Sequence, residues 1–301
     1  MKDFKGKVAV ITGGASGLGR EFANRAAELG MKIVLADVQK DALDKAAAEL
    51  EGQGADVLAL TCDVRDEDEV RALVVATILH FKAVHLLFNN AGVGSGGLIW
   101  ENSKADWEWV LGVNLWGVIN GIRMFTPPML KQGELDPAYE GYIVNTASMA
   151  GLLNAPAMGV YNVSKHAVVS LTETLYHDLQ LVDAPIGVSV LCPYFVPTGI
   201  SQSHRNRPDD VKMEDAPTAS QKAAQAMTQK AVESGKVSAA DVAKITFDAI
   251  AAGQFYIFSH PGALGGVATR MEDIVNVRNP SDPYAATPHV RDALQAKMQT
   301  K

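Results

Sequence analysis

A glycine-rich turn near the amino terminus constrains the fold of this chain more than any other feature. The turn is Thr12-Gly13-Gly14-Ala15-Ser16-Gly17-Leu18-Gly19, between a short buried-strand pattern, Val8–Thr12, and a helical pattern that begins at Gly17. Glycines let a backbone turn tightly and approach a phosphate, and a helix amino terminus offers free N–H groups to an anion. A strand, a glycine turn and a helix in this order therefore predict a dinucleotide site.

The spacing of these glycines separates the turn from two better-known phosphate loops. Gly-x3-Gly-x-Gly differs from the commoner Gly-x-Gly-x-x-Gly fingerprint, and no Gly-Lys-Ser/Thr follows, which excludes a Walker loop. From the pattern alone, a purely structural glycine loop is the alternative. The position of the turn directly after the first strand pattern makes that alternative less favourable.

Asp37 ends the second strand pattern, where an acidic side chain accepts hydrogen bonds from the adenosine ribose. A carboxylate here would repel a 2′-phosphate, and the neighbouring Val38 offers no cation to bind one. The sequence therefore favours NAD(H) over NADP(H). Two alternatives stay open: Asp37 is a helix cap or turn residue, or the nearby cations Arg20 and Lys40 support NADP(H) binding.

Strand-like and helical patterns alternate along most of the chain. The expected strands are short and apolar, as in strands that a sheet buries on both faces. They are Val8–Thr12, Ile33–Ala36, Val57–Cys62, His85–Asn89, Tyr142–Thr146, Gly187–Cys192 and Phe255–Phe258. The expected helices are Gly17–Gly30, Asp41–Glu51, Asp66–Phe81, Trp107–Met124, Tyr161–Leu181 and Ala239–Ala252. This alternation predicts an α/β fold, a Rossmann-type doubly wound parallel sheet of about seven strands with helices on both faces.

No linker divides the chain, so we expect a single domain over residues 1–301, with a core of about 5–260. Three segments break the alternation of strands and helices. Lys131–Gly141 is expected to be a surface loop. Residues 199–236 are polar and partly helical, and their composition suits a mobile lid. Residues 261–301 form a tail with two helical patches, Val267–Val277 and Val290–Met298.

Composition and charge exclude several classes of protein. With 48% apolar and 20% charged residues, the chain is typical of a soluble globular protein. A net charge of −7 disfavours binding to nucleic acid or to an anionic membrane surface. The longest apolar stretches, such as Ala72–Leu79, are shorter than the roughly 20 residues of a membrane span. The amino terminus lacks the apolar core of a signal peptide.

The reactive side chains indicate neither disulfides nor a metal. Only two cysteines occur, Cys62 and Cys192, and both lie in strand patterns, so we expect buried, inert thiols. None of the seven histidines lies in a His-Glu-x-x-His arrangement, and no cysteine-rich zinc site is available. We therefore expect no metal and a reducing, cytoplasmic setting.

Several motifs occur in an order and at spacings that resemble those of the short-chain dehydrogenase/reductase family, over residues 5–260. They are the glycine turn Thr12–Gly19, Asp63-Val64, Asn89-Asn90-Ala91-Gly92, Asn114, Ser148 and Tyr161-x3-Lys165. The resemblance implies an oxidoreductase that moves a hydride between an alcohol carbon and a nicotinamide cofactor. It also implies a cofactor site formed by Gly13, Ser16, Gly17, Leu18, Gly19, Asp37, Asp63, Val64, Asn90, Ala91, Gly92, Tyr161, Lys165, Pro193, Val196 and Thr198.

Hydride transfer also moves a proton, and by resemblance Tyr161 is the acid and base that moves it. A free tyrosine has a pKa of about 10, and we expect the cation of Lys165, one helical turn away, to lower the pKa of Tyr161. Lys165 would also hold the nicotinamide ribose. Ser148 is expected to donate to the substrate oxygen, and Asn114 to hold a water that relays the proton.

Each of these residues has a structural alternative. Tyr161 and Lys165 could form an exposed helix face, Ser148 could cap a break after a strand, and Asn114 could bend a helix by bonding its own backbone. The complete set nevertheless favours catalysis. It disfavours a non-catalytic nucleotide-binding sensor on the same fold, and the absence of a long sugar-nucleotide domain disfavours a dehydratase or epimerase.

The run after the sixth strand pattern departs from the family. It is Pro193-Tyr194-Phe195-Val196-Pro197-Thr198, with Tyr194 where the family usually has glycine. The expected walls of the substrate pocket are Leu152, Leu153, Asn154, Met158, Tyr194 and Phe195. All but Asn154 are apolar or aromatic, which favours a hydrophobic, aryl or alicyclic secondary alcohol or its ketone. The pattern with its extended tail also resembles bacterial members that oxidise alcohols on bulky hydrophobic molecules. By resemblance, Trp107–Met124 and Tyr161–Leu181 pair in a homodimer or homotetramer.

Overall fold

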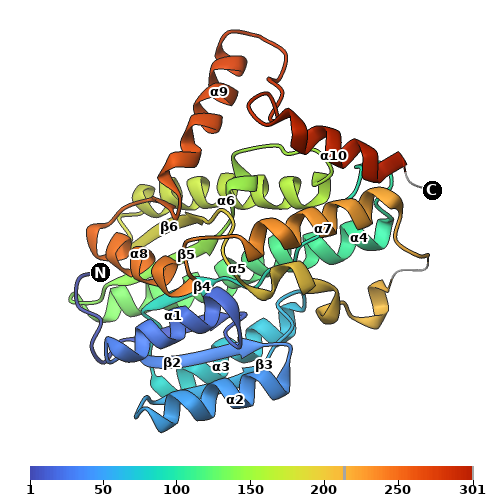
Figure 1. Cartoon of the computed structure of the whole chain (residues 1–301). Coiled ribbons are helices and arrows are strands. Elements are labelled where there is room, and N and C mark those ends of the chain that lie inside the picture. Colours follow the sequence, from blue (N-terminus) through green and yellow to red (C-terminus); the bar gives the residue numbers. More distant parts are fainter. Residues whose placement is uncertain (213–214, 300–301) are drawn as a thin grey trace.

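The structure is a computed structural model that describes residues 1–212 and 215–299. Met213 and Glu214, within the predicted lid, and Thr300 and Lys301, at the end of the predicted tail, lie outside the described residues. Figure 1 shows the whole chain.

A seven-stranded parallel sheet forms the centre of the molecule, in the order β3-β2-β1-β4-β5-β6-β7. The strands are β1 (Val8–Thr12), β2 (Lys32–Asp37), β3 (Val57–Thr61), β4 (Leu86–Asn89), β5 (Gly141–Thr146), β6 (Ile186–Cys192) and β7 (Tyr256–Phe258). The predicted fold is confirmed. The strand order reverses between β1 and β4, and ligands of such sheets bind beyond the carboxyl ends of the strands at this point.

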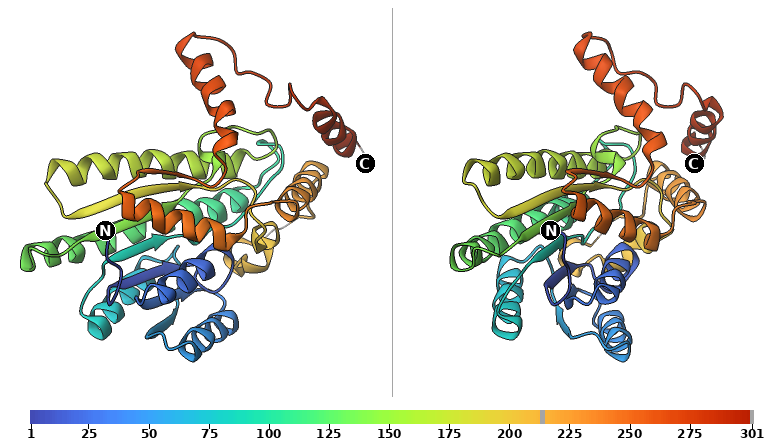
Figure 2. Two further views of the ribbon diagram at one scale, coloured as in Figure 1. Left: turned by 60° about the vertical axis from the view of Figure 1, so that its left-hand side comes forward. Right: turned by 90° about the vertical axis from the view of Figure 1, so that its left-hand side faces the viewer.

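Helices cover both faces of the sheet (Figures 1 and 2). On one face, α1 (Gly17–Glu28), α2 (Lys40–Gly52) and α8 (Ala239–Ala252) bury Phe22, Leu43 and Phe247 against the strands. On the other face, α3 (Glu67–Phe81), α5 (Gly117–Leu135) and α6 (Gly159–Leu181) bury residues such as Leu73, Phe125 and Leu175. These side chains recur at helical spacing, so each helix turns one apolar stripe to the sheet.

The predicted helix Trp107–Met124 is wrong as a single regular helix. Instead, α4 (Lys104–Leu111) runs into a π-helical turn, η1 (Gly112–Trp116), and then into α5. A π-helical turn inserts one extra residue into a helix and often marks a functional site. Here the turn carries Asn114, whose side chain is fully buried.

The predicted loop Lys131–Gly141 is also partly wrong, because α5 continues to Leu135. Two prolines, Pro127 and Pro128, lie inside this helix and weaken its sequence signal. Met129 is fully buried in the core beyond them, so tertiary packing holds the last turns of the helix.

The remaining segments form an edge of the molecule next to the carboxyl ends of the strands. Residues 199–236 contain the 3-10 segments η3 (Gly199–Asn206) and η4 (Asp209–Val211) and the helix α7 (Ala219–Glu233). The tail contains α9 (Leu264–Val275) and α10 (Pro288–Gln299), close to the two predicted helical patches. Figures 1 and 2 show α9 projecting from the body, after which the chain returns and α10 packs on α7. None of the helices in the described part of the chain has the length and apolar character needed to cross a membrane.

Candidate active site

The glycine turn packs so closely on the neighbouring strand end that side chains are excluded. Gly13 has a φ of 63°, and a Cβ there would lie 2.9 Å from the Cα of Ala91. A Cβ on Gly19 would lie only 2.0 Å from the carbonyl oxygen of Gly13. Because no side chains stand at these positions, the amino terminus of α1 is open to the space above the turn. Its N-cap, Ser16, makes no side-chain capping bond, so the first-turn N–H groups have no partner from that side chain.

Thr12 and Asn90 lock the turn to the end of β4. The Oγ1 of Thr12 accepts hydrogen bonds from the N–H groups of Asn90 and Ala91 at 2.9 and 3.1 Å. The Nδ2 of Asn90 donates to the carbonyl oxygen of Thr12 at 3.0 Å, and Thr146 donates to the Oδ1 of Asn90 at 3.3 Å. Thr12 and Thr146 are positioning residues that were not predicted; the available signal was their place at strand ends beside the motifs.

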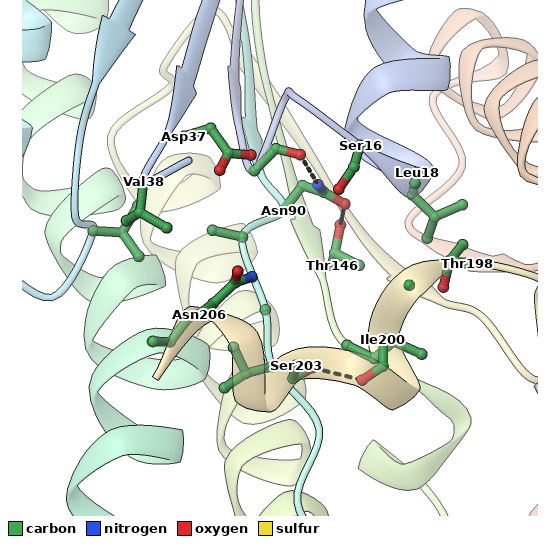
Figure 3. Close-up of a pocket in the computed structure, with 18 of the residues that line it drawn as sticks. Ser16, Leu18, Asp37, Val38, Asn90, Thr146, Thr198, Ile200, Ser203 and Asn206 are labelled. Atoms are coloured by element: carbon green, nitrogen blue, oxygen red, sulfur yellow. Dashed lines mark hydrogen bonds between the residues drawn. The ribbon is translucent and has the colours of Figure 1, made fainter. Parts of the chain in front are cut away.

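A cleft of about 200 Å³ lies over this edge of the sheet. Figure 3 shows it between the ends of the first strands, with Asp37 and Asn90, and the 3-10 segment that carries Ile200, Ser203 and Asn206. The cleft brings together all the predicted cofactor residues except Gly19, which lies beneath the turn. Those that line it are Gly13, Ser16, Gly17, Leu18, Asp37, Asp63, Val64, Asn90, Ala91, Gly92, Tyr161, Lys165, Pro193, Val196 and Thr198.

The two acidic residues of the cleft already have protein partners. The carboxylate of Asp37 accepts hydrogen bonds from the N–H groups of Ala15, at 3.1 Å, and Gln39, at 3.0 Å, so it acts also as a turn residue. The carboxylate of Asp63 forms an ion pair with Arg65 at 2.8 Å. Arg65 lines the cleft as well and was not singled out from the sequence.

Ser148, Tyr161 and Lys165 lie together where β5 ends and α6 begins. The Nζ of Lys165 lies 5.7 Å from the centre of the Tyr161 ring and donates to the carbonyl oxygen of Thr146 at 2.9 Å. Ser148 begins the short turn after β5, and its Oγ accepts from the N–H of Ala150 at 3.1 Å. Ser148 also serves as a cap, as its structural alternative predicted.

The expected lowering of the Tyr161 pKa is wrong. Burial raises the pKa of Tyr161, and a hydrogen bond from Ser148 opposes that shift only in part. Burial also lowers the pKa of Lys165 to about 8. Both shifts have one cause, since a charge loses hydration in this enclosed position, and the ammonium does not offset the loss for the phenolate.

Asn114 connects the π-helical turn to the loop after β4. Its Oδ1 accepts from the N–H of Val93 at 2.8 Å, and its Nδ2 donates to the carbonyl oxygen of Val93 at 3.0 Å and to the Oγ of Ser164 at 3.1 Å. A Cβ on Gly92 would lie 3.5 Å from the Oδ1 of Asn114 and 3.6 Å from the Nζ of Lys165. The turn therefore brings Asn114 close to Lys165, and its side chain bonds to Val93 and Ser164 and not to its own helix.

A second, larger cavity of about 990 Å³ adjoins the cleft. Of the predicted wall residues, Leu153, Asn154, Met158, Tyr194 and Phe195 line it. Leu152 is not among the lining residues; like Leu153, it packs against the apolar cluster that contains Val168. Ser148, Tyr161 and Tyr194 line both the cleft and the cavity, so these side chains stand where the two spaces meet.

A buried ion pair ties residues 199–211 to α4 in the wall of this cavity. Arg207 and Asp106 lie 2.6 Å apart, and their side chains are only 8% and 3% exposed. The guanidinium of Arg207 also lies over the ring of Trp109, 5.0 Å from its centre, and Gln221 donates to Asp106 at 3.2 Å. Neither member of the pair was predicted, because the two residues are 101 positions apart and no local pattern joins them.

Comparisons with known proteins agree with this geometry. A family model described as short chain dehydrogenase matches residues 7–209. The chain is 35% identical to a "CLA biosynthesis dehydrogenase/reductase" of Lactiplantibacillus plantarum, over 91% of this chain and 95% of that protein. It is 39% identical to a "C alpha-dehydrogenase" of Sphingobium sp., over 69% of this chain and 66% of that protein.

A solved structure is similar over almost its whole length. It is a short chain dehydrogenase/reductase from Burkholderia phymatum in complex with NAD, with 54% sequence identity and a TM-score of 0.92. The match covers 94% of this chain and 99% of that chain. Because the family model spans most of the chain and these relatives share its motifs and sheet, the chain belongs to the short-chain dehydrogenase/reductase family, oxidoreductases that act on CH–OH groups.

Proposed function

We propose that this chain interconverts a hydrophobic secondary alcohol, aryl or alicyclic, and its ketone with NAD(H), using Tyr161 as acid and base. The observation that carries the proposal is the position of Ser148 and Tyr161 at the junction of the cleft and the larger cavity. A cofactor in the cleft and a substrate in the cavity would then meet at these two side chains.

The residues present fit a dinucleotide. The glycine turn leaves no side chain between the backbone and a phosphate, and the uncapped amino terminus of α1 faces the cleft through Ser16, Gly17 and Leu18. Asp37 would hold the adenosine ribose, and Lys165 and Tyr161 the nicotinamide ribose. When bound, the nicotinamide accepts or supplies the hydride, and its oxidised form adds a positive charge beside the reacting groups.

The protein groups would handle the proton and the developing charge. The hydroxyl of Tyr161 gives its proton to the substrate oxygen during reduction and takes it back during oxidation. Ser148 donates to the same oxygen and stabilises its negative charge. Lys165 lies close enough to favour the phenolate electrostatically, and Asn114, next to Lys165, would hold a water for proton exchange with solvent.

Charge around the adenosine end favours NAD(H). The two cations that could have supported NADP(H) binding are each paired with a carboxylate. Arg20 pairs with Glu49 at 2.9 Å, and Lys40 pairs with Asp44 at 2.6 Å. Asp37 and Val38 line the cleft instead. The NAD in the similar Burkholderia phymatum structure supports the same choice.

Replacing Asp37 with alanine should relax the preference for NAD. Removing the carboxylate removes the repulsion of a 2′-phosphate, so we expect the ratio of kcat/KM with NAD to kcat/KM with NADP to fall by about tenfold or more. Steady-state kinetics with both cofactors measure this ratio, which is insensitive to a general loss of activity. Asp41→Ala, at an exposed position in the first turn of α2, is the control. An unchanged ratio in Asp37→Ala would contradict the role assigned to this carboxylate.

A panel of alcohols tests the substrate class. We expect aryl and alicyclic secondary alcohols to be oxidised with far higher kcat/KM than small hydroxy acids, because the cavity is large and Leu153, Met158 and Phe195 are among its walls. The formation of NADH, followed by absorbance, measures each rate. Faster turnover of small hydroxy acids than of the bulky alcohols would refute the proposed class.

We propose further that the protein is a cytoplasmic homodimer or homotetramer. Both cysteines are buried thiols, and burial raises the pKa of each to about 12, which suits a protein without disulfides. Two helices expected at the dimer interface expose large apolar side chains, Trp116 in the α4–α5 unit and Val163 and Tyr176 on α6. Light scattering of the purified protein measures the oligomeric state.

A further inference from the structure

The tail builds one wall of the large cavity. Residues Gly266, Thr269, Arg270, Asp273 and Ile274 of α9 line the cavity, and their spacing places them on one face of the helix. The chain that follows also lines it, through Tyr284 among others. The substrate space is thus closed on this side by a segment outside the family model match at residues 7–209.

One positively charged side chain of the cavity, Arg270, has no ion-pair partner among the described residues. Six charged side chains line the cavity: Asp106, Arg207, Arg270, Asp273, Arg278 and Asp282. Asp106 pairs with Arg207 at 2.6 Å, Asp273 with Arg278 at 3.1 Å, and Asp282 with Arg291 at 2.8 Å. Arg270 has neither an ion pair nor a hydrogen bond with any of the described residues.

The side chain of Arg270 borders the cavity and is not simply a solvent-exposed surface residue. Its side chain is half-buried, and its positive charge adds to the effect of burial in lowering the pKa of His166 on α6. The guanidinium therefore lies near enough to His166 to act on its charge, and His166 belongs to the helix that carries Tyr161. An arginine that lines the cavity without an ion pair can bind an anionic group of a molecule held there.

We propose that Arg270 binds an anionic group of the substrate, so that the preferred substrates are amphiphilic. Such a molecule carries the secondary alcohol or ketone at its hydrophobic end, against Tyr161, and a carboxylate at its other end. This inference rests on the proposed function, because it assigns the distant end of the substrate whose reacting end lies at Ser148 and Tyr161. The two other arginines that line the cavity, Arg207 and Arg278, are not available, because Asp106 and Asp273 balance their charges.

The test compares a charged and a neutral form of one molecule. The probes are ω-hydroxy-ω-phenylalkanoates of increasing chain length, each with its methyl ester. We expect the wild type to favour the acid over the ester at one or more chain lengths. In Arg270→Gln, the KM of that acid should rise by about tenfold or more, as the loss of one charge-assisted contact predicts, while the kcat values and the ester kinetics stay close to wild type.

Two further variants control the result. Arg270→Lys retains the charge and should keep part of the preference for the acid. Lys222→Gln removes a positive charge from an exposed position of α7 that does not line the cavity, and it should leave both probes unaffected. Equal losses for acid and ester in Arg270→Gln, or no loss for either, would overturn the proposal.

A direct binding measurement separates this proposal from the proposed function. The ketone form of each carboxylate is titrated against the enzyme–cofactor complex by calorimetry, with wild type and Arg270→Gln. If the wild type oxidises none of the alcohols, the proposed function fails, and the weaker binding expected of Arg270→Gln still tests the anion site. If neutral alcohols are oxidised and the two proteins bind the carboxylate equally, only the anion site fails.

Discussion

Replacing Tyr161 with phenylalanine should lower kcat/KM for any alcohol by about a hundredfold to ten-thousandfold, the usual contribution of a positioned acid and base. The variant loses only the hydroxyl oxygen, so the ring contact with Lys165 and the packing of α6 are retained. NADH formation measures the rate, and fluorescence titration with NADH should show a much smaller loss in binding than in rate, because Lys165 still holds the nicotinamide ribose.

The matched control for this variant is Tyr176→Phe on the same helix. That side chain is partly exposed and lines neither the cleft nor the cavity, so its loss of a hydroxyl should leave activity at the level of the wild type. A Tyr161→Phe protein with full turnover would rule out the mechanism.

The raised pKa of Tyr161 also sets the pH dependence of the two directions. Burial keeps Tyr161 protonated across neutral pH, which suits the donation of a proton to a ketone. Oxidation needs the phenolate, so its rate should rise with pH into the alkaline range, whereas reduction should fall there. Rate profiles measured in both directions would show opposite slopes; parallel slopes would contradict this assignment.

Replacing Asp106 with asparagine should destabilise the protein by about 3–5 kcal/mol, because the substitution leaves the buried cation of Arg207 without a counter-charge. Unfolding in urea, followed by circular dichroism, measures the loss. Asp248→Asn, which breaks an exposed pair with Lys244, should cost less than about 1 kcal/mol and is the matched control.

A double substitution tests whether the lost stability comes from the unpaired charge of Arg207. In Asp106→Asn combined with Arg207→Met, no unpaired charge is left in the wall, so much of the lost stability should return. If the double variant is less stable than Asp106→Asn by the full effect of Arg207→Met alone, the two side chains do not interact as argued.

The features that the sequence predicted well are those with a local cause. The parallel sheet follows from short apolar runs that alternate with helices, and the bounds of α8 (Ala239–Ala252) agree with the prediction. The cleft could also be anticipated, because the glycine turn and the residues around Asn90 must meet at the carboxyl ends of β1 and β4.

The features that were missed depend on contacts between distant segments. The π-helical turn at Asn114 is stabilised by bonds to Val93, which no helical periodicity reports. Leu152 lies directly after the short turn that follows Ser148 and does not line the cavity. The pKa of Tyr161 depends on how far its position excludes water, since burial raises it. The presence of a lysine one helical turn away does not report the extent of that burial.

Because α9 forms a wall of the cavity, the choice of substrate and the proposed chemical step depend on different parts of the chain. The groups proposed to carry out the reaction, such as Ser148 and Tyr161, come from segments before residue 200, whereas Arg270 and Tyr284 come from the tail. Changes in the tail can therefore alter which molecule is accepted without disturbing the atoms that react with it. Exchange of the tail alone would therefore change which substrate this chain accepts and would leave the proposed chemical step as it is.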